Sequence, residues 1–451
     1  GTTIHLVPTQ TPYPPNITIR RNGTPEARLV LDGHGSVISG RRAFPADAWQ
    51  DEGDGVYSRK LANNAWGMHR HWEGGFPLVW FDGEPGTNVA TKEDLTPGAF
   101  FLYKNRKNSK KDPLHNTLFI RLPAGRTFGD VRVESIVGDK SIGICVLGDY
   151  VTVRNVVCEY GGRDGFSTTR NKGVLFENVE ARYYMDQGIS NHGAQTVVRH
   201  GHFHHNAGCG IVDVYDEAKV RYEKCLIEHD TWRGGVEFHS GTFEMVDCLI
   251  RGNPSKALSV SRNARVRLSN CLLIAPEARK AGGVSLGNGC SLTLERCTLV
   301  GFSIGLAARL VPTGGALAVR DSAFLGCKTN MKIIGIQDAG APELDLAKIL
   351  STGGNLYEPA PFLLELRRRP APGARWKIAK HAFSPEEYPD FAARMTDDPA
   401  AEVRAMEAAA NPEALSRLTR ADGTPVGASL PQDVGVQAQP AGPVKETDAA
   451  E

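Results

Sequence analysis

Six side chains that could transfer protons or bind a sugar occur in three neighbouring segments of the sequence. Each segment contributes two of them, two residues apart: Ser190 and His192, Asp213 and Tyr215, Glu237 and His239. Carboxyl, imidazole and phenol groups serve enzymes as general acids and bases. Two carboxylates can also hydrolyse a glycosidic bond when the fold brings them together. Their chemistry therefore depends on the elements that carry them.

These segments belong to a repeat marked by cysteines. Cys225, Cys248, Cys271 and Cys297 recur at intervals of 23, 23 and 26 residues, in the similar phrases KCLI, DCLI, NCLL and RCTL. Periods of this length indicate a solenoid, and short strands without a helical period argue against βαβ and leucine-rich repeats. We predict an all-β fold, a right-handed single-stranded parallel β-helix. The cysteines should stack inside it rather than form disulfides or bind metal, in one column with Ser322, Gly201, Val179 and Val156.

The flanking sequence predicts further parts. We expect residues 1–45 to form an N-terminal β-helix cap, 46–127 an inserted β module, and 128–357 the coils, which resume at VRVESIVG. A C-terminal extension follows at 358–430, with a short helix at 397–418 that begins near an Asp N-cap. The composition of residues 431–451 predicts a disordered tail.

Strand parity decides which side chains face outward, because successive residues of a strand point to opposite faces. In the other coils the first inward residue precedes the next inward strand by seven or eight residues, as Phe166 precedes Val174. In CGIVDVYD, the distance to the next inward residue, Val220, is eight residues if Val212 is the first inward residue and nine if Ile211 is. We therefore place Val212 and Val214 inward. Two outward columns follow: Ser167, Ser190, Asp213, Glu237, Ser259, Ser285, Ala307, and Thr169, His192, Tyr215, His239, Ser261, Gly287, Arg309.

This parity predicts a pair of neighbouring acids. With rungs about 4.8 Å apart, the carboxylates of Asp213 and Glu237 would lie about 5 Å apart, the separation found in retaining glycosidases. Two carboxylates so close raise the pKa of one of them, which leaves a proton donor opposite a nucleophile. The alternative is an ordinary solvated outer face.

Metal binding is not the favoured interpretation of the remaining polar residues. His200, His202, His204 and His205 form a run, but strand alternation should place their side chains on opposite faces, whereas zinc needs three or four converging ligands. A calcium ion bound by the oxygens of Asp213, Asp216 and Glu237 is an alternative. We expect no other cofactor.

Aromatic and basic residues near the polar segments are candidates for substrate binding. Trp66, Arg70 and Trp72 lie in the glycine-flanked segment AWGMHRHWEGGF, and Trp232 and Arg233 come shortly before Glu237. Indole rings pack on the apolar faces of sugars. The alternative for Trp66 and Trp72 is that they hold the inserted module on the coils.

Charge and hydropathy exclude several classes of partner. The chain has 52 basic and 51 acidic residues, a net charge of +1, so no global field attracts nucleic acid. No apolar stretch is long enough to span a membrane, and mean hydropathy is -0.29. We expect a polysaccharide or oligosaccharide partner, with oligomerisation left open. The sequence opens at Gly1 without the basic and apolar regions of a signal peptide, and we expect that one was removed or never existed. From the substrate class we expect a secreted or periplasmic protein.

Part of the sequence resembles a known family. The phrase GISNHGAQTVVRHGHFHHNAGCGIVDVYDEAKVRYEKCLI, followed by GGVEFHSG, resembles the core of parallel β-helix glycoside hydrolases of the β-xylosidase type, within the wider pectate-lyase-like superfamily. The opening ITIRRNGTPEARLVLDGHGSVISG, with DGVYSRKL after it, is similar to the N-terminal cap of that group. The resemblance implies a nucleophile on or within one position of Asp213, an acid/base on Glu237 and a groove histidine at His192.

The first functional hypothesis is a retaining glycoside hydrolase. Glu237 would protonate the glycosidic oxygen while Asp213 attacks the anomeric carbon, and Glu237 would then activate water. His192, Tyr215 and His239 would bind sugar hydroxyls or steady the nucleophile.

The second hypothesis is a polysaccharide lyase or uronate epimerase. His192 or His239 would take the C5 proton of a uronate, and Tyr215 would serve the leaving oxygen. The uronate carboxylate needs a cation, for which Arg170 and Lys172 are weak candidates, so the sequence favours hydrolysis. A non-catalytic carbohydrate-binding or adhesive β-helix is the third interpretation.

Overall fold

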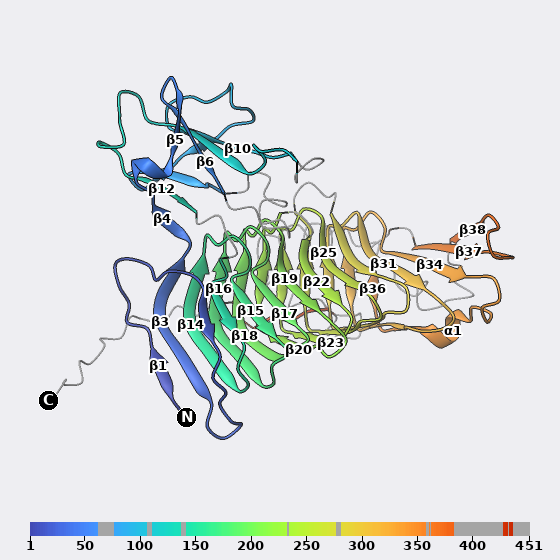
Figure 1. Cartoon of the computed structure of the whole chain (residues 1–451). Coiled ribbons are helices and arrows are strands. Elements are labelled where there is room, and N and C mark those ends of the chain that lie inside the picture. The colour runs from blue at the N-terminus through green and yellow to red at the C-terminus, as the bar shows by residue number, and fades with distance from the viewer. Residues whose placement is uncertain are drawn as a thin grey trace.

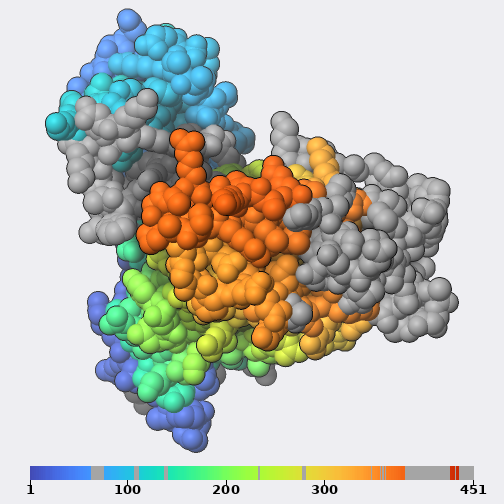
Figure 2. Space-filling model, turned by 90° about the vertical axis from the view of Figure 1, so that its right-hand side faces the viewer, coloured from blue at the N-terminus to red at the C-terminus, as the bar shows by residue number. Residues whose placement is uncertain are grey.

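The protein is an elongated solenoid of short strands that carries a smaller β module over its N-terminal coils (Figure 1). The computed structural model describes residues 1–61, 76–105, 111–136, 141–231, 234–276, 281–357, 360, 362–382, 427–431 and 433–435. In the view along the solenoid, its C-terminal end faces the reader and the module rises beyond it (Figure 2). The predicted all-β fold and parallel solenoid are confirmed.

One wall of the solenoid is a sheet of 12 described strands, parallel except for its last pair. Its strands, in spatial order, are β2 (Ile17–Ile19), β13 (Ile144–Val146), β15 (Phe166–Thr169), β17 (Ile189–His192), β19 (Cys209–Val214), β22 (Gly234–His239), β25 (Lys256–Ser261), β28 (Gly282–Leu286), β31 (Ile304–Leu310), β34 (Met331–Gln337), β37 (Phe362–Arg368) and β38 (Lys377–Ala382). We call it the site sheet, because it carries five of the predicted site residues: Ser190, His192, Asp213, Glu237 and His239.

The other walls form a bent sheet of 17 described strands. Its first strands are β1 (Thr3–His5), β3 (Leu29–Ser39), β14 (Val151–Glu159), β16 (Val174–Arg182) and β18 (Gln195–His204). In later coils two shorter strands replace each long one: β20 (Lys219–Glu223), β21 (Leu226–Glu228), β23 (Thr242–Val246), β24 (Leu249–Arg251), β26 (Arg265–Ser269), β27 (Leu272–Ile274), β29 (Ser291–Glu295), β30 (Thr298–Val300), β32 (Leu317–Arg320), β33 (Ala323–Leu325), β35 (Leu350–Gly353) and β36 (Leu356–Tyr357). The short helix α1 (Leu346–Ile349) precedes β35.

The interior is a stack of aliphatic and aromatic side chains that includes the predicted cysteine ladder. Cys225, Cys248, Cys271 and Cys297 are fully buried, and all cysteines in the described residues are free thiols. Each ladder cysteine follows a residue with positive φ, such as Lys224 at 52°. This left-handed residue bends the chain at a corner and turns the next side chain inward. The cysteine column is therefore a packing feature, as predicted.

The inserted module is built from two small sheets. One contains β5 (Gln50–Gly53), β6 (Val56–Lys60), β11 (Thr117–Arg121), β10 (Ala99–Tyr103) and β9 (Thr87–Asn88); the other contains β4 (Arg41–Ala43), β12 (Val133–Ile136), β7 (Val79–Phe81) and β8 (Glu84–Pro85), and a 3-10 turn, η1 (Ala46–Ala48), follows β4. Because β12 pairs antiparallel with β4 and β7, the segment VRVESIVG does not restart the coils as predicted. The module runs from β4 to β12, and the coils resume at β13.

Aromatic side chains fix the module on the coils. Trp80 meets Tyr160 edge to face at 4.8 Å between ring centroids, and Phe76 lies 5.7 Å from Tyr183. Met185 and Ala207 of the coils belong to the same buried cluster. The module therefore shares an apolar core with the solenoid rather than projecting on a free linker.

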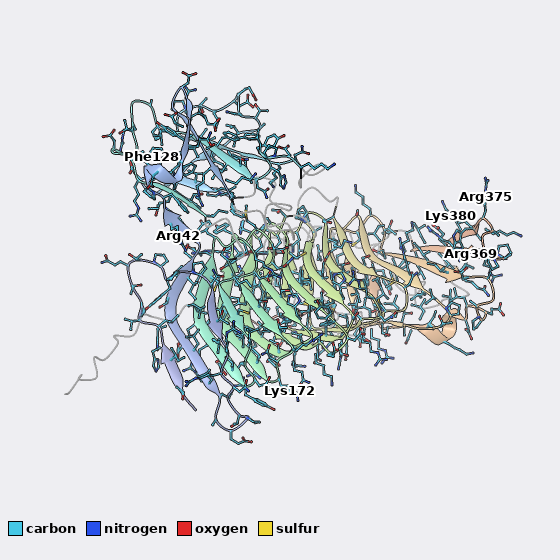
Figure 3. The ribbon with its side chains drawn as sticks, in the orientation of Figure 1. Arg42, Phe128, Lys172, Arg369, Arg375 and Lys380 are labelled. Atoms are coloured by element: carbon cyan, nitrogen blue, oxygen red, sulfur yellow. The ribbon has the colours of Figure 1, made fainter. Side chains whose placement is uncertain are left out.

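The C-terminal end differs in two respects from the expected boundaries. The coils continue past Tyr357, since β37 pairs parallel with β34 and then turns back as β38. Arg369, Arg375 and Lys380 project from this hairpin (Figure 3). Residues 433–435, which the sequence assigned to the tail, contact the coils, where Gly435 N–H donates to Lys224 O. The predicted helix at 397–418 lies outside the described residues.

No helix within the described ranges is long and apolar enough to cross a membrane.

Candidate functional site

The register of β19 overturns the predicted orientation of Asp213. Ile211 is aligned with Ile189 on one side and Val236 on the other, and Asp213 with Asn191 and Phe238. Ile211 and Asp213 are fully buried, whereas Val212 and Val214 are partly exposed. Asp213 therefore points into the solenoid, and the two valines point outward.

The error arises because turn length varies between coils. Two residues lead from β22 to β23, whereas four lead from β19 to β20 (215–218), from β15 to β16 and from β28 to β29. Tyr215 begins this longer turn with a φ of 82°, a left-handed conformation that bends the chain away from the strand. The spacing of nine residues from Ile211 to Val220 is therefore absorbed by the turn and leaves the strand parity unchanged.

Asp213 and Glu237 consequently lie on opposite faces of the site sheet. Glu237 is aligned with Val212 and Ser259 in the outward column, as predicted for this residue. The neighbouring pair of carboxylates expected for a retaining glycosidase is not formed. The predicted calcium ligands Asp213 and Glu237 are separated for the same reason.

Asp213 is part of a buried hydrogen-bond network. Asn191 donates to its Oδ1 from the backbone N–H at 3.1 Å and from Nδ2 at 2.6 Å, and Tyr222 Oη–H donates to Oδ2 at 2.8 Å. Burial nonetheless raises the pKa of Asp213 to about 7, partly opposed by these donors. The same burial raises the pKa of Tyr222 well above its usual value. Asp213 thus ties β17, β19 and β20 together from inside.

Two polar pairs remain on the outer side of the site sheet, which we call the site face. Ser190 and His192 lie on β17, and Glu237 and His239 lie on β22. Val212 and Val214 occupy the strand between them. Two rungs of a parallel sheet place the pairs about 10 Å apart. The site face therefore presents two polar groups on either side of an apolar strip.

A chain of hydrogen bonds fixes the second pair. Ser261 Oγ lies 2.6 Å from His239 Nδ1, and His239 Nε2 lies 3.1 Å from Glu237 Oε2. With Ser261 donating to Nδ1, His239 donates from Nε2 to the carboxylate. Glu237 is 7 % exposed, so its carboxylate is held in one orientation. It can accept hydrogen bonds from a ligand, but no second carboxylate faces it from the described strands of the two outward columns.

The first pair is completed by a tyrosine. Ser190 Oγ lies 3.1 Å from His192 Nε2, and the rings of His192 and Tyr215 are 5.9 Å apart. The sequence predicted that Tyr215 would be aligned with His192 in the neighbouring strand. Val214 occupies that position instead, and Tyr215 contacts His192 from the turn that follows β19. Tyr215 is 52 % exposed. Imidazole and phenol are thus accessible together at one point of the site face.

One arginine places positive charge near His192. Burial lowers the pKa of His192, and the charge of Arg163 lowers it further, so the ring is neutral near pH 7. The backbone N–H of Arg170 donates to His192 O at 2.9 Å, and a Cβ placed on Gly193 would be 3.5 Å from Arg170 Cγ, 3.5 Å from Glu217 Oε2 and 3.7 Å from Tyr215 Cβ. The sequence singled out Arg170 but not Arg163, which precedes β15 in the same coil.

The remaining predicted binding residues cannot be placed. Trp66, Arg70, Trp72, Trp232 and Arg233 lie outside the described residues.

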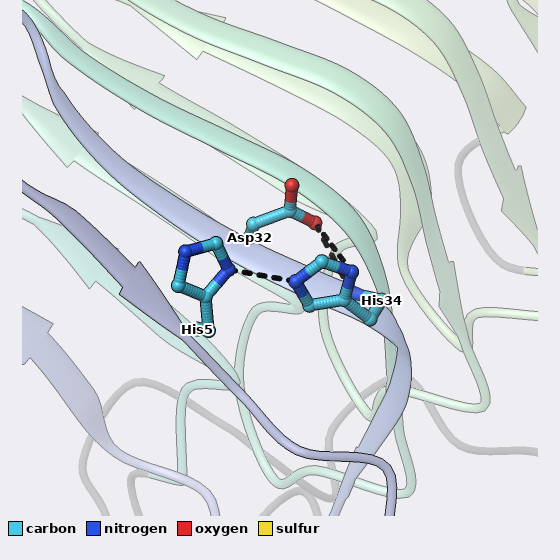
Figure 4. A group of neighbouring side chains, drawn as sticks. All are labelled: His5, Asp32 and His34. Atoms are coloured by element: carbon cyan, nitrogen blue, oxygen red, sulfur yellow. Dashed lines mark hydrogen bonds and ion pairs between the residues drawn. The ribbon is translucent and has the colours of Figure 1, made fainter. Parts of the chain in front are cut away.

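Two groups in the described residues have the composition of a metal site. In the first, His5 Nδ1 and His34 Nε2 are 2.7 Å apart, and Asp32 Oδ1 lies 3.8 Å from His34 Nδ1 (Figure 4). Both histidines are exposed, and Arg154 already pairs with Asp32 at 2.7 Å. The second group combines Glu180, His202 and His204. The expectation that alternation would separate the histidine run is wrong for His202 and His204, whose rings stack at 4.1 Å.

Comparison with known proteins supports the architecture. The model of the family described as "Right handed beta helix region" matches residues 123–273. No curated protein matches the chain. Similar solved structures include the pectate lyase Pel9A (13% identity, TM-score 0.33, covering 47% of this chain and 71% of that one) and a glycoside hydrolase (10%, 0.41, 79% and 88%). The tailspike protein gp49 from Pseudomonas phage LKA1 is also similar (14%, 0.24, 81% and 77%). At these identities and scores the similarities carry no argument about activity.

Proposed function

We propose that this β-helix protein cleaves a uronate-containing polysaccharide by β-elimination at the site face. The observation that carries the proposal is the pairing of a neutral His192 with the exposed Tyr215, close enough to Arg163 for its charge to lower the pKa of His192. A base, an acid and a cation are the three groups that this reaction needs. The buried position of Asp213 argues against the retaining hydrolase that the sequence favoured.

The reaction balances with the groups of the first pair. His192 takes the proton from C5 of the uronate, the C5 electron pair forms the C4–C5 double bond, and the C4–O bond breaks. Tyr215 gives its phenolic proton to the departing oxygen, and proton exchange with water restores both side chains. When Nε2–H of His192 donates to Ser190 Oγ, the lone pair that accepts the proton is on Nδ1.

The arginines make the C5 proton removable. Negative charge develops on the uronate carboxylate as the proton leaves, and a guanidinium is suited to hold a carboxylate with two hydrogen bonds. The charge of Arg163 acts on His192, and the side-chain stem of Arg170 passes beside Gly193, so in this proposal one of the two guanidinium groups faces the carboxylate of a sugar bound there. Of the two cations that the sequence proposed, Arg170 is retained in this role.

The second pair serves binding in this proposal. Glu237 and His239 lie about 10 Å along the solenoid from Ser190 and His192, so they would contact a different sugar unit of the same chain. The carboxylate of Glu237, fixed by His239, would accept hydrogen bonds from sugar hydroxyls. The apolar strip of Val212 and Val214 would lie under the chain between the two pairs.

The proposal is tested by following ultraviolet absorbance, which reports the unsaturated uronate that elimination creates. The full chain is incubated with polygalacturonate, alginate and glucuronate-containing polymers, and with a neutral xylan as control. We expect absorbance to rise on at least one polyuronate and to stay flat on the neutral polymer. Release of reducing ends from a polysaccharide without any rise in absorbance would contradict elimination.

A further inference from the structure

We propose that Glu180, His202 and His204 bind a divalent transition-metal ion of the zinc class. The three residues lie on the outer surface of the 17-stranded sheet, on β16 and β18, and share no residue with the site face. The proposal is thus independent of the elimination chemistry.

The register of two strands brings the three side chains together. Glu180 is directly opposite His202 across the β16–β18 pair, and His204 follows two residues later on the same side. One ligand atom from each residue can be chosen so that all three lie within 4.8 Å of one another. Ligand atoms around a tetrahedral zinc with bonds of about 2.0–2.1 Å stand about 3.3 Å apart. Small side-chain movements therefore suffice to close the set around an ion.

One pair of candidate ligand atoms already has the separation expected around zinc. His204 Nε2 and Glu180 Oε1 are 3.1 Å apart, with a hydrogen bond between them. A metal ion can replace the shared proton with little change in that separation. His204 is 8 % exposed, and its ring stacks on His202 at 4.1 Å, so neither ring is free to swing away.

Neighbouring residues supply the outer contacts that metal ligands usually have. His202 Nε2 lies 2.9 Å from Glu228 Oε1, and His204 Nδ1 lies 2.7 Å from His205 Nδ1. These contacts orient the two imidazole rings. Each partner sits on the solenoid itself, so the arrangement is set by the coils.

One cation competes with the proposed metal for Glu180. Arg182 Nη1 donates to Glu180 Oε1 at 2.7 Å. The same guanidinium also donates to Glu159 Oε2 from Nε at 3.0 Å and from Nη2 at 2.8 Å. Arg182 therefore retains two hydrogen bonds to one carboxylate oxygen of Glu159 when Glu180 turns to an ion.

The donor set selects the class of metal. Two imidazole nitrogens and one carboxylate suit zinc, cobalt or nickel, with a water completing the coordination, whereas calcium and magnesium prefer all-oxygen sets. Because the ligands come from two adjacent coils, binding would hold those coils together and stabilise the folded state by mass action.

The experiment is zinc titration of the chelator-treated full chain by calorimetry, with melting temperature recorded in parallel. We expect one zinc ion per chain and a melting temperature that rises with zinc concentration. His204→Gln and Glu180→Gln should each weaken binding by more than about 10–100-fold, the loss typical when only an outer hydrogen-bond partner of a metal ligand is removed. His34→Gln, which disables the other histidine group, should bind zinc as the unmodified chain does.

Two results would overturn the proposal: the absence of saturable zinc binding, or equal zinc affinity in His204→Gln. Loss of binding in His34→Gln with retention in Glu180→Gln would also overturn it, because it would place the ion at the N-terminal group. If His204→Gln fails to fold, cobalt replaces zinc in the unmodified chain. Visible bands of a tetrahedral nitrogen and oxygen site support the proposal, and the spectrum of hydrated cobalt alone contradicts it.

Discussion

Replacing His192 with glutamine is expected to lower kcat/KM for uronate elimination about 10²–10⁴-fold, the usual contribution of a general base. Glutamine can keep a hydrogen bond to Ser190 but cannot take the C5 proton. The measurement is the initial rate of the ultraviolet signal on the polyuronate that the protein degrades best. Tyr215→Phe, which removes the proton donor and keeps the ring, should cause a loss of similar size.

The pH profile and a control variant test whether the loss of rate is due to His192 acting as the base. The pKa of His192 is lowered from its usual 6.5, so the acidic limb of kcat/KM in the unmodified chain should fall below pH 6.5, as the base is lost only when that lower pKa is crossed. His34→Gln removes an exposed histidine of the N-terminal coil and should leave the rate unchanged. Full activity of His192→Gln would remove this residue from the mechanism.

Replacing Asp213 with asparagine is expected to change the pH dependence of stability and to preserve most of the activity. The pKa of Asp213 is about 7 in the folded chain against about 3.9 when unfolded, so between these values the folded state binds the extra proton. The stabilisation that protonated Asp213 adds to the free energy of unfolding is therefore fully present below about pH 3.9, the unfolded pKa. It is lost as pH rises from there through the folded pKa of about 7. We expect this loss to be about 2–4 kcal/mol. Asparagine, which does not ionise, should abolish it.

The measurement is denaturant unfolding of both chains at intervals between pH 4 and pH 8. Asp216→Asn is the matched control, because Asp216 is an exposed acid three residues further on, outside the buried hydrogen-bond network of Asp213. Loss of activity in Asp213→Asn with unaltered stability would show that this carboxyl group acts in catalysis after all.

Much of the fold follows from spacing that is visible in the sequence. The recurrence of Cys225, Cys248, Cys271 and Cys297 identifies an inward column, because each occupies the same place in its coil after a left-handed corner residue. Outward positions such as Ser190 and Glu237 follow from parity in coils where the turn is short. These predictions succeed because each depends on residues within one coil.

The wrong predictions concern features that residue spacing does not determine, namely the length of a turn and the partner with which a strand pairs. Counting residues from Ile211 assumed that the spacing between strands is nearly constant, but the turns differ in length from coil to coil, and this reversed the predicted orientation of Asp213. The segment around Val133 alternates as a coil strand would, yet it pairs antiparallel within the module.

The prediction for the histidine run was wrong for a similar reason. His202 and His204 gain their carboxylate neighbours, Glu180 and Glu228, from the strands on either side. Only the register between coils reveals that grouping.

The central claim, that the site face cleaves its substrate by elimination, is tested most directly by digestion of a polyuronate in water enriched in heavy oxygen, followed by mass spectrometry of the fragments. Elimination adds no water across the broken bond, so we predict fragments with unsaturated ends and no heavy oxygen introduced by cleavage, after correction for exchange at reducing ends. One heavy oxygen retained for each bond cleaved would demonstrate hydrolysis and contradict the account.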